Sequence, residues 1–162
     1  MRRVALKTMM VLGVALLAGC GFALRGPIVL PFNSAYVDAA PGSALGAMLS
    51  KQLAQQSKLA TQRDKADVIL KLSDESQSKD ILTLSSTGTV QEYRLTTKVT
   101  IAASGAAGEE VLPPAALQQV RDYSYNPNLA LASDALESTL RHDMNLDLLQ
   151  QIGRRLVFVH KP

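Results

Sequence analysis

The stretch DILTLSSTGTVQEYRLTTKVTIAAS, residues 80–104, decides the fold because it holds two strand patterns on either side of one turn. Its second half alternates with a period of two: Tyr93, Leu95, Thr97, Val99 and Ile101 fall on one side, and Arg94, Thr96, Lys98 and Thr100 on the other. Such alternation predicts a strand with one face against a core and the other in water. The small polar residues from Ser86 to Gly88 predict the turn of a hairpin.

A further strand pattern lies upstream, in DVILKLS, residues 67–73. The apolar residues that share one side of this extended segment are Val68, Leu70 and Leu72. They predict a half-buried strand. A polar stretch of serine, glutamine and lysine follows, and its acidic residues are Asp74, Glu75 and Asp80. This composition is typical of an exposed turn rather than of an ion site.

Two more strands complete the expected sheet. A short one is predicted near residues 36–39, and another over residues 117–125. The pair Pro113-Pro114 sets off the latter, because proline cannot donate to a ladder and a central strand would not tolerate it. The pair Glu109-Glu110 follows a glycine-containing turn, and we interpret it as exposed.

Two segments carry apolar residues at helical spacing. The first follows Pro41-Gly42, and Ser43 is placed to cap it, since its hydroxyl can accept a backbone N–H that the helix leaves unpaired. Its apolar positions are Leu45, Met48, Leu49 and Leu53. The second begins after Asn126-Pro127, where proline suits the first turn of a helix. Its apolar stripe comprises Leu136, Leu140, Met144, Leu148, Leu149, Ile152 and Leu156.

The order strand, helix, several strands and long helix predicts an α+β fold. We expect a two-layer sandwich in which two helices pack on one face of a roughly four-stranded mixed sheet. A chain of 162 residues with 47% hydrophobic content suits one domain with its own core. We place that domain at residues 34–162.

The N-terminus has the three parts of a secretory signal. Arg2, Arg3 and Lys7 come first without an acidic residue, an apolar run over residues 9–18 follows, and small residues end it. The run is shorter than the about 20 residues that a membrane-spanning helix needs. We therefore expect residues 1–19 to be a signal peptide that is removed.

The sequence Leu17-Ala18-Gly19-Cys20 resembles the lipobox of bacterial lipoproteins. That resemblance implies an S-diacylglycerol and an N-acyl group on Cys20, which together anchor a chain stably to a membrane. Residues 20–33 would form the lipidated N-terminus and tether, and Gly21, in place of an aspartate, favours the outer membrane. The alternative is an ordinary cleavage site beside an unmodified cysteine. As the only cysteine of the chain, Cys20 has no partner for an internal disulfide.

Removal of the signal changes the charge balance. The full chain has 17 basic and 14 acidic residues, and loss of the three basic residues in segment 1–19 leaves equal numbers of each. A balanced chain has no excess of positive charge for binding nucleic acid, so we expect no nucleic-acid partner.

The sequence contains no nucleophile elbow, phosphate-binding loop or metal-ligand spacing. Its two histidines are His142 and His160. His142 stands beside Asp143 in the last helical segment, and adjacent residues on a helix do not face each other. We therefore interpret His142 as a solvent-exposed side chain and expect no catalytic residue, no cofactor and no metal site.

Four motifs, in their order and spacing, resemble the LptE family of lipopolysaccharide-assembly lipoproteins. They are CGFALRG (20–26), QEYRLTTKVTI (91–101), VRDYSYNPNLALA (120–132) and LRHDMNLDLLQQIGRRL (140–156). The first is the most specific, and its family positions here are Cys20, Gly21, Phe22, Leu24 and Arg25. The resemblance covers essentially all of the mature chain.

The resemblance implies a sandwich of two helices and four strands that plugs the lumen of the outer-membrane β-barrel LptD. It further implies help in barrel assembly and in delivery of lipopolysaccharide to the outer leaflet. The protein would then be lipid-anchored on the periplasmic side of the outer membrane and largely inside the barrel. Its partners would be LptD, lipopolysaccharide and the membrane itself.

The residues are compatible with that role, because the interior wall of a wide barrel is polar and so is one face of the 93–101 strand. Lipopolysaccharide contact would require cations for its phosphates, and the candidates are Arg94, Lys98 and Arg121. Family members can carry basic residues in the turn before this strand and at the start of the last helix. This chain has Ser85, Ser86 and Ser133 there, so the plug role has more support than direct lipid contact.

Two other classes of function stay open from the sequence alone. One is a lipid-anchored periplasmic adaptor for a different envelope complex, and the other is a tethered periplasmic hydrolase. Co-purification with a large heat-modifiable barrel distinguishes a plug from an adaptor. Alanine replacement of His142 and His160 tests the hydrolase.

Overall fold

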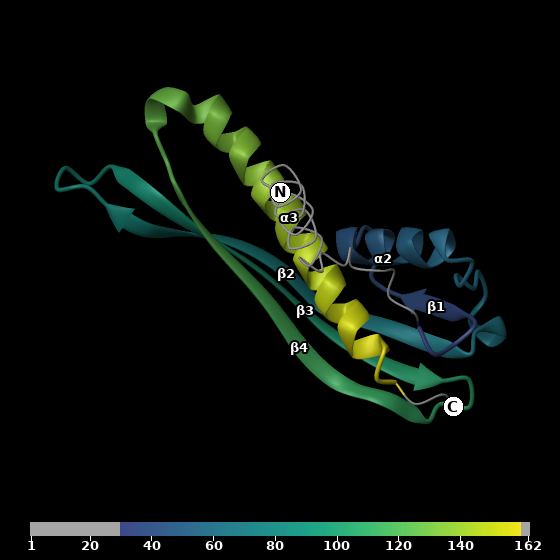
Figure 1. Ribbon diagram of the computed structural model, residues 1–162. Helices are drawn as coiled ribbons and strands as arrows, with labels where there is room; N and C mark the ends of the chain where they lie inside the picture. Colours follow the sequence, from purple (N-terminus) through teal and green to yellow (C-terminus); the bar gives the residue numbers. More distant parts are fainter. Residues whose placement is uncertain (1–29, 160–162) are drawn as a thin grey trace, which may run out of the picture.

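Four strands and two long helices make up residues 30–159, the part of the chain that the computed structural model describes (Figure 1). The elements are β1 (Ala35–Asp38), α2 (Ala44–Gln55), β2 (Val68–Leu84), β3 (Val90–Gly105), β4 (Glu110–Ser124) and α3 (Ala130–Leu156), with short 3-10 turns η1 (Arg63–Lys65) and η2 (Pro127–Leu129). Both helices lie on one side of the sheet. The predicted α+β sandwich with a mixed four-stranded sheet is confirmed.

The strands follow one another across the sheet in the order β1-β2-β3-β4. β1 runs parallel to β2, and the other neighbours are antiparallel. Of the residues of β2, only the first four, from Val68 to Lys71, pair with β1. β2, β3 and β4 continue much further as a three-stranded sheet, and Figure 1 shows the β2–β3 hairpin extending past the helices.

The polar stretch after Ser73 is part of β2, so the predicted turn there was wrong. β2 is one strand of 17 residues, with a bulge between Ser73 and Ser76 where Asp74 adopts a positive φ of 54°. Beyond the bulge, Ser76 pairs with Lys98 and Asp80 with Arg94. Because β3 supplies hydrogen-bond partners along the whole length, local polarity does not end the strand.

β4 begins at Glu110, before the proline pair that was expected to set its start. Pro113-Pro114 lies in the strand because β4 is at the edge of the sheet and because its register with β3 shifts there, between Ile101 and Ala103. An edge strand forms ladder hydrogen bonds with a neighbour on one side only, so it can hold a residue that lacks a backbone N–H. A bulge interrupts the ladder at the same point and so accommodates the second proline.

The core lies between the sheet and the helices, as the alternation in β3 predicts. Its largest fully buried side chains are Phe32, Leu45, Leu53, Val68, Leu70, Leu95, Val99, Ile101, Met144, Leu148, Ile152 and Leu156. The predicted cap is also present: the Gly46 backbone N–H donates to Ser43 Oγ over 2.8 Å. The Ser43 hydroxyl in turn donates to Glu75 beside the β2 bulge, which joins the start of α2 to the sheet.

The predicted stripe of α3 fails at its N-terminal end, where Leu136 is 44% exposed. Each step of four residues advances about 40° beyond a full turn, so five steps back from Leu156 rotate the stripe by about 200°. Leu136 therefore points away from the sheet, while Ser133 is buried and Glu137 is half-buried. Asn126 caps η2 by accepting from the Asn128 N–H, and α3 follows that turn.

The chain enters the core earlier than the expected tether boundary, since Leu30 and Phe32 are both buried. The Lys58 ammonium donates to the carbonyl oxygens of both residues. The Asp67 carboxylate accepts from the backbone N–H groups of Asn33 and Ser34. These contacts fix the first described residues to the domain.

Neither α2 nor α3, nor any other helix within residues 30–159, combines the length and the hydropathy that a transmembrane span requires.

Candidate functional site: the open face of the sheet

The side of the sheet opposite the helices has no helix on it in the described part of the chain (Figure 1). Register places the polar side of β3 at its centre, between outward residues of β2 and β4. At the centre of this surface the outward positions are Thr96, Lys98 and Thr100 on β3, Ser76 and Ser78 on β2, and Ala116, Gln118 and Val120 on β4. We call the whole surface the open face, and small hydroxyl and amide side chains dominate its centre.

Arg94 lies on the open face and is held by Asp122 of β4. Arg94 Nε and Nη2 each donate to one carboxylate oxygen over 2.8 Å, which forms a two-pronged ion pair. The hydrogen bond to Asp122 raises the pKa of Arg94, and the hydrogen bond from Arg94 lowers the pKa of Asp122. Arg94 is therefore already neutralised by a neighbour on its own sheet.

Lys98 lies near the middle of the open face and forms no ion pair with any residue from 30 to 159. It borders a shallow hollow of about 370 Å³ whose polar lining also includes Asp74, Ser76, Thr100 and Gln118. The ammonium is thus available to a ligand anion, although Asp74 places one opposing charge in the same hollow.

Arg121 lies on the helix side of the sheet, because it pairs in register with the buried Leu95. Its guanidinium donates to Asp147 of α3 and, over 3.2 Å, to Gln119. The three cations predicted as lipopolysaccharide contacts are therefore not one cluster. Arg94 and Lys98 share the open face, whereas Arg121 links sheet to helix.

A second cluster of charges, centred on Glu137, holds the N-terminal half of α3 to β2. Lys79 Nζ lies 2.6 Å from Glu137 Oε2, and the Tyr123 hydroxyl donates to the same oxygen over 3.0 Å. Arg141 binds the other oxygen at 2.7 Å. Lys79 Nζ also lies 4.3 Å from the centre of the Tyr93 ring, in a cation–π arrangement. We call these five residues the Glu137 cluster.

The cluster shifts the ionisation of its members. Burial alone would raise the pKa of Glu137, but hydrogen bonds from Lys79, Arg141 and Tyr123 outweigh it and lower that pKa to about 2. The hydrogen bond to Glu137 raises the pKa of Lys79. Burial raises the pKa of the Tyr123 hydroxyl. Sequence reasoning missed this cluster, because Lys79 and Glu137 are distant in the chain and neither lies in a motif.

The remaining predicted residues fall in several places. His142 and Asp143 are exposed on α3, as expected. Ser85 and Ser86 lie at the β2–β3 turn, and Ser133 donates to the Leu129 carbonyl within the first turn of α3. The N-terminal motif positions Cys20, Gly21, Phe22, Leu24 and Arg25 lie outside the described residues, as does His160. Within the described chain, no three His, Cys, Asp or Glu side chains are grouped as metal ligands.

Comparisons with known proteins relate this chain to one family by sequence and to solved structures by fold. The family model described as "LptE: Lipopolysaccharide-assembly" matches residues 28–156. The chain belongs to the LptE family. The LPS-assembly lipoprotein LptE of Photorhabdus laumondii is 29% identical, with 99% of this chain and 89% of that protein aligned. The LptE lipoprotein of Pectobacterium atrosepticum is 28% identical, over 93% of this chain and 85% of that one.

A solved structure with the same architecture is that of lipoprotein B from Nitrosomonas europaea. It is 29% identical, has a TM-score of 0.73, and aligns with 85% of this chain and 90% of its own. Membership in the LptE family makes the chain an envelope lipoprotein with a role in lipopolysaccharide assembly and not an enzyme. The hydrolase alternative is thereby set aside.

Proposed function

We propose that this LptE-family chain is a lipid-anchored plug of an LptD-type outer-membrane barrel, which assists assembly of the barrel and delivery of lipopolysaccharide to the outer leaflet. The observation that carries the proposal is the open face. It spreads over strands of 15 to 17 residues with small polar side chains. A surface of this kind matches the polar interior wall of a wide barrel.

The dimensions of the sheet support the same role. A strand of 15 residues extends about 50 Å at about 3.3 Å per residue. The apolar band of an outer-membrane barrel is about 25 Å tall, so the open face is long enough to follow the lumen through the whole membrane. Its serine, threonine and glutamine side chains can both donate and accept hydrogen bonds with the wall.

The anchor is the second part of the proposal. We infer that Cys20 carries the lipid and that residues 1–19 are removed, which leaves nine residues between the lipidated cysteine and the buried Leu30. Fully extended, the chain from Cys20 to Leu30 reaches about 35 Å. The domain is thereby kept close to the membrane while the tether allows it to enter a barrel.

Lys98 is the residue of the open face that we propose for contact with a lipopolysaccharide phosphate. It has no ion-pair partner within residues 30–159, whereas Arg94 would first have to leave Asp122 and Arg121 would have to leave Asp147. A lysine ammonium binds phosphate as a point charge and forms charge-assisted hydrogen bonds with its oxygens.

A matched pair of tryptophan variants tests the plug proposal. Ser78 is exposed on the open face, opposite Thr96, and Ser138 is exposed on α3. Ser78→Trp should reduce co-purification of the large barrel from detergent-solubilised outer membranes several-fold, while Ser138→Trp should leave it unchanged. Circular dichroism checks that both variants fold. Equal barrel recovery with both variants, or no barrel with the wild-type protein, would overturn the proposal.

A further inference from the structure

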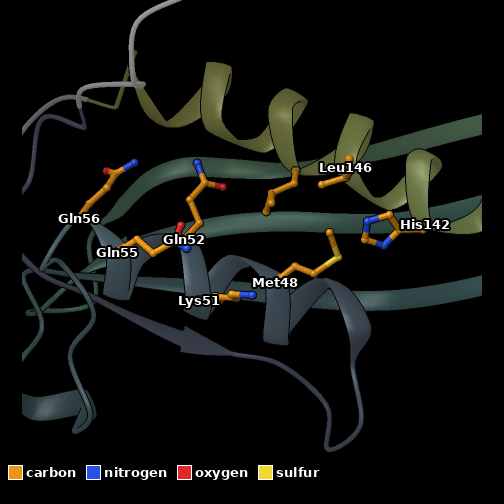
Figure 2. Close-up of a pocket in the computed structure, with 8 residues that line it drawn as sticks. Met48, Lys51, Gln52, Gln55, Gln56, His142 and Leu146 are labelled. Atoms are coloured by element: carbon orange, nitrogen blue, oxygen red, sulfur yellow. The ribbon is translucent and has the colours of Figure 1, made fainter.

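A groove of about 640 Å³ runs between α2 and α3, in the helix layer and away from the open face (Figure 2). From α2 it is lined by one stripe at helical spacing, which comprises Met48, Lys51, Gln52 and Gln55, followed by Gln56. From α3 it is lined by His142, Leu146 and Leu149. Its volume falls in the range of sites that hold small ligands or peptide side chains.

The lining has a defined chemistry. Met48 and the buried Leu149 form an apolar base, beside Leu146, which is 39% exposed. Three glutamine amides border the base, and each can donate and accept hydrogen bonds, as a peptide backbone does. Lys51 contributes a positive charge, and the described residues that line the groove include no carboxylate. Lys51 also forms no ion pair within residues 30–159.

We propose that this groove binds an acidic peptide segment of a partner protein. A large apolar side chain of the segment packs on Met48 and Leu146. Its backbone groups bond to the glutamine amides of α2, and its carboxylate pairs with Lys51. The site is separate from the proposed contact with the barrel wall, so this inference goes beyond the plug role.

Charge and hydrogen bonding favour a peptide segment over other occupants. The chain's own residues 21–29 contain Arg25 and no acidic residue, so they do not complement Lys51. A second copy packed groove against groove would bring two Lys51 side chains together. An acyl chain would cover the glutamine amides without replacing their hydrogen bonds, which costs free energy.

Site-specific photo-crosslinking tests the groove in the full-length protein within its own cell envelope. A benzoylphenylalanine at Gln52 is combined with Lys51→Glu, or with the matched control Lys65→Glu in η1, an exposed lysine outside the groove. We expect an adduct whose partner peptide carries an acidic residue beside a large apolar one. Its yield should fall at least fivefold in Lys51→Glu and stay unchanged in Lys65→Glu.

Two additional variants complete the test. Lys51→Ala preserves helix propensity and should give a partial loss of the adduct. In the Lys51→Glu background, replacement of the partner's acidic residue by lysine reverses both charges and should restore the adduct. The proposal is overturned by an adduct with lipid or with a second copy, by no adduct, or by a yield that does not respond to residue 51. Barrel co-purification is measured in the same samples, so a failure of the plug role is recognised separately.

Discussion

Glu137 of α3 and Lys79 of β2 are 58 residues apart in the chain, and their charged atoms lie 2.6 Å apart. The contact lies in the N-terminal half of α3, outside the main core. The buried apolar cluster in this region comprises only Leu95, Tyr123 and Met144 and is much smaller than the main core. Ion pairing and hydrogen bonding at Glu137 therefore supplement the limited apolar packing of this half of the helix.

Removal of the Glu137 charge should destabilise the protein. Its side chain is 17% exposed, and Glu137→Gln leaves Lys79 and Arg141 without their shared anion. We expect the free energy of unfolding at pH 7 to fall by about 2 kcal/mol. Urea denaturation measures the change, and Glu110→Gln at an exposed position should change it by less than about 0.5 kcal/mol.

The same pair predicts a pH dependence. The pKa of Glu137 is about 2 in the folded protein, against an ordinary value of 4.5, so the unfolded chain binds a proton more readily than the folded chain. The stabilisation is complete above about pH 4.5 and is lost as the pH falls toward 2. The difference in unfolding free energy between wild type and Glu137→Gln should therefore shrink as the pH is lowered from about 4.5 toward 2. A difference that persists unchanged at pH 2 would contradict the role of the charge.

The N-cap of α2 predicts a contrast between two serines. Ser43→Ala removes the acceptor for the Gly46 N–H and the donor to Glu75, and should lower the free energy of unfolding by about 1 kcal/mol. Ser50 lies within the same helix and donates only to the Gly46 carbonyl. Ser50→Ala should be close to neutral, because alanine favours the helix interior. Equal losses in urea denaturation would show that the cap has no special role.

Two leucines of α3 test where its core face lies. Leu148 is fully buried and Leu131 is 86% exposed. Leu148→Ala should cost about 3 kcal/mol, in the range of cavity-forming substitutions, and Leu131→Ala should change the free energy of unfolding by less than about 0.5 kcal/mol. Thermal or urea unfolding of the two variants provides the comparison. A larger loss of unfolding free energy for Leu131→Ala than for Leu148→Ala would contradict the assignment of Leu148 to the core face of α3.

Sequence patterns predict the parts of this fold in which local and tertiary preferences agree. In β3 the side chains from Tyr93 to Ile101 alternate as the burial does, because one face packs on helices and the other does not. The Ser43 cap and the buried face of α2 were predictable for a similar reason. Local hydrogen bonding and helical spacing determine them almost alone.

The sequence misleads where tertiary contacts override local preference. The polar part of β2 forms a strand because β3 pairs with it, and Pro113-Pro114 is tolerated because nothing pairs with the outer edge of β4 in the described chain. Lys79 and Glu137 meet only because α3 packs on β4 and β3, within reach of the long Lys79 side chain on β2. The groove stripe of Met48, Lys51 and Gln52 does have a sequence signal, namely its helical spacing, but that spacing alone does not show which helix faces it.

The lipid anchor gives a prediction of its own. Cys20→Ala removes the thiol that would accept diacylglycerol, so the variant should be soluble in the periplasm or remain unprocessed. Cell fractionation followed by mass spectrometry of the N-terminal peptide measures both outcomes. An unmodified Cys20 in the membrane-bound wild-type protein would contradict the anchoring mechanism.

If the open face lies against the inner wall of a barrel, a photo-crosslinking amino acid in place of Thr96 should detect that contact in intact outer membranes. Thr96 pairs with Ser78 on one side and Val120 on the other, at the middle of that face. We expect adducts between the crosslinker at position 96 and barrel-strand residues whose side chains point into the lumen. A membrane-anchored protein in which this crosslinker forms no adduct with any barrel would rule out the contact.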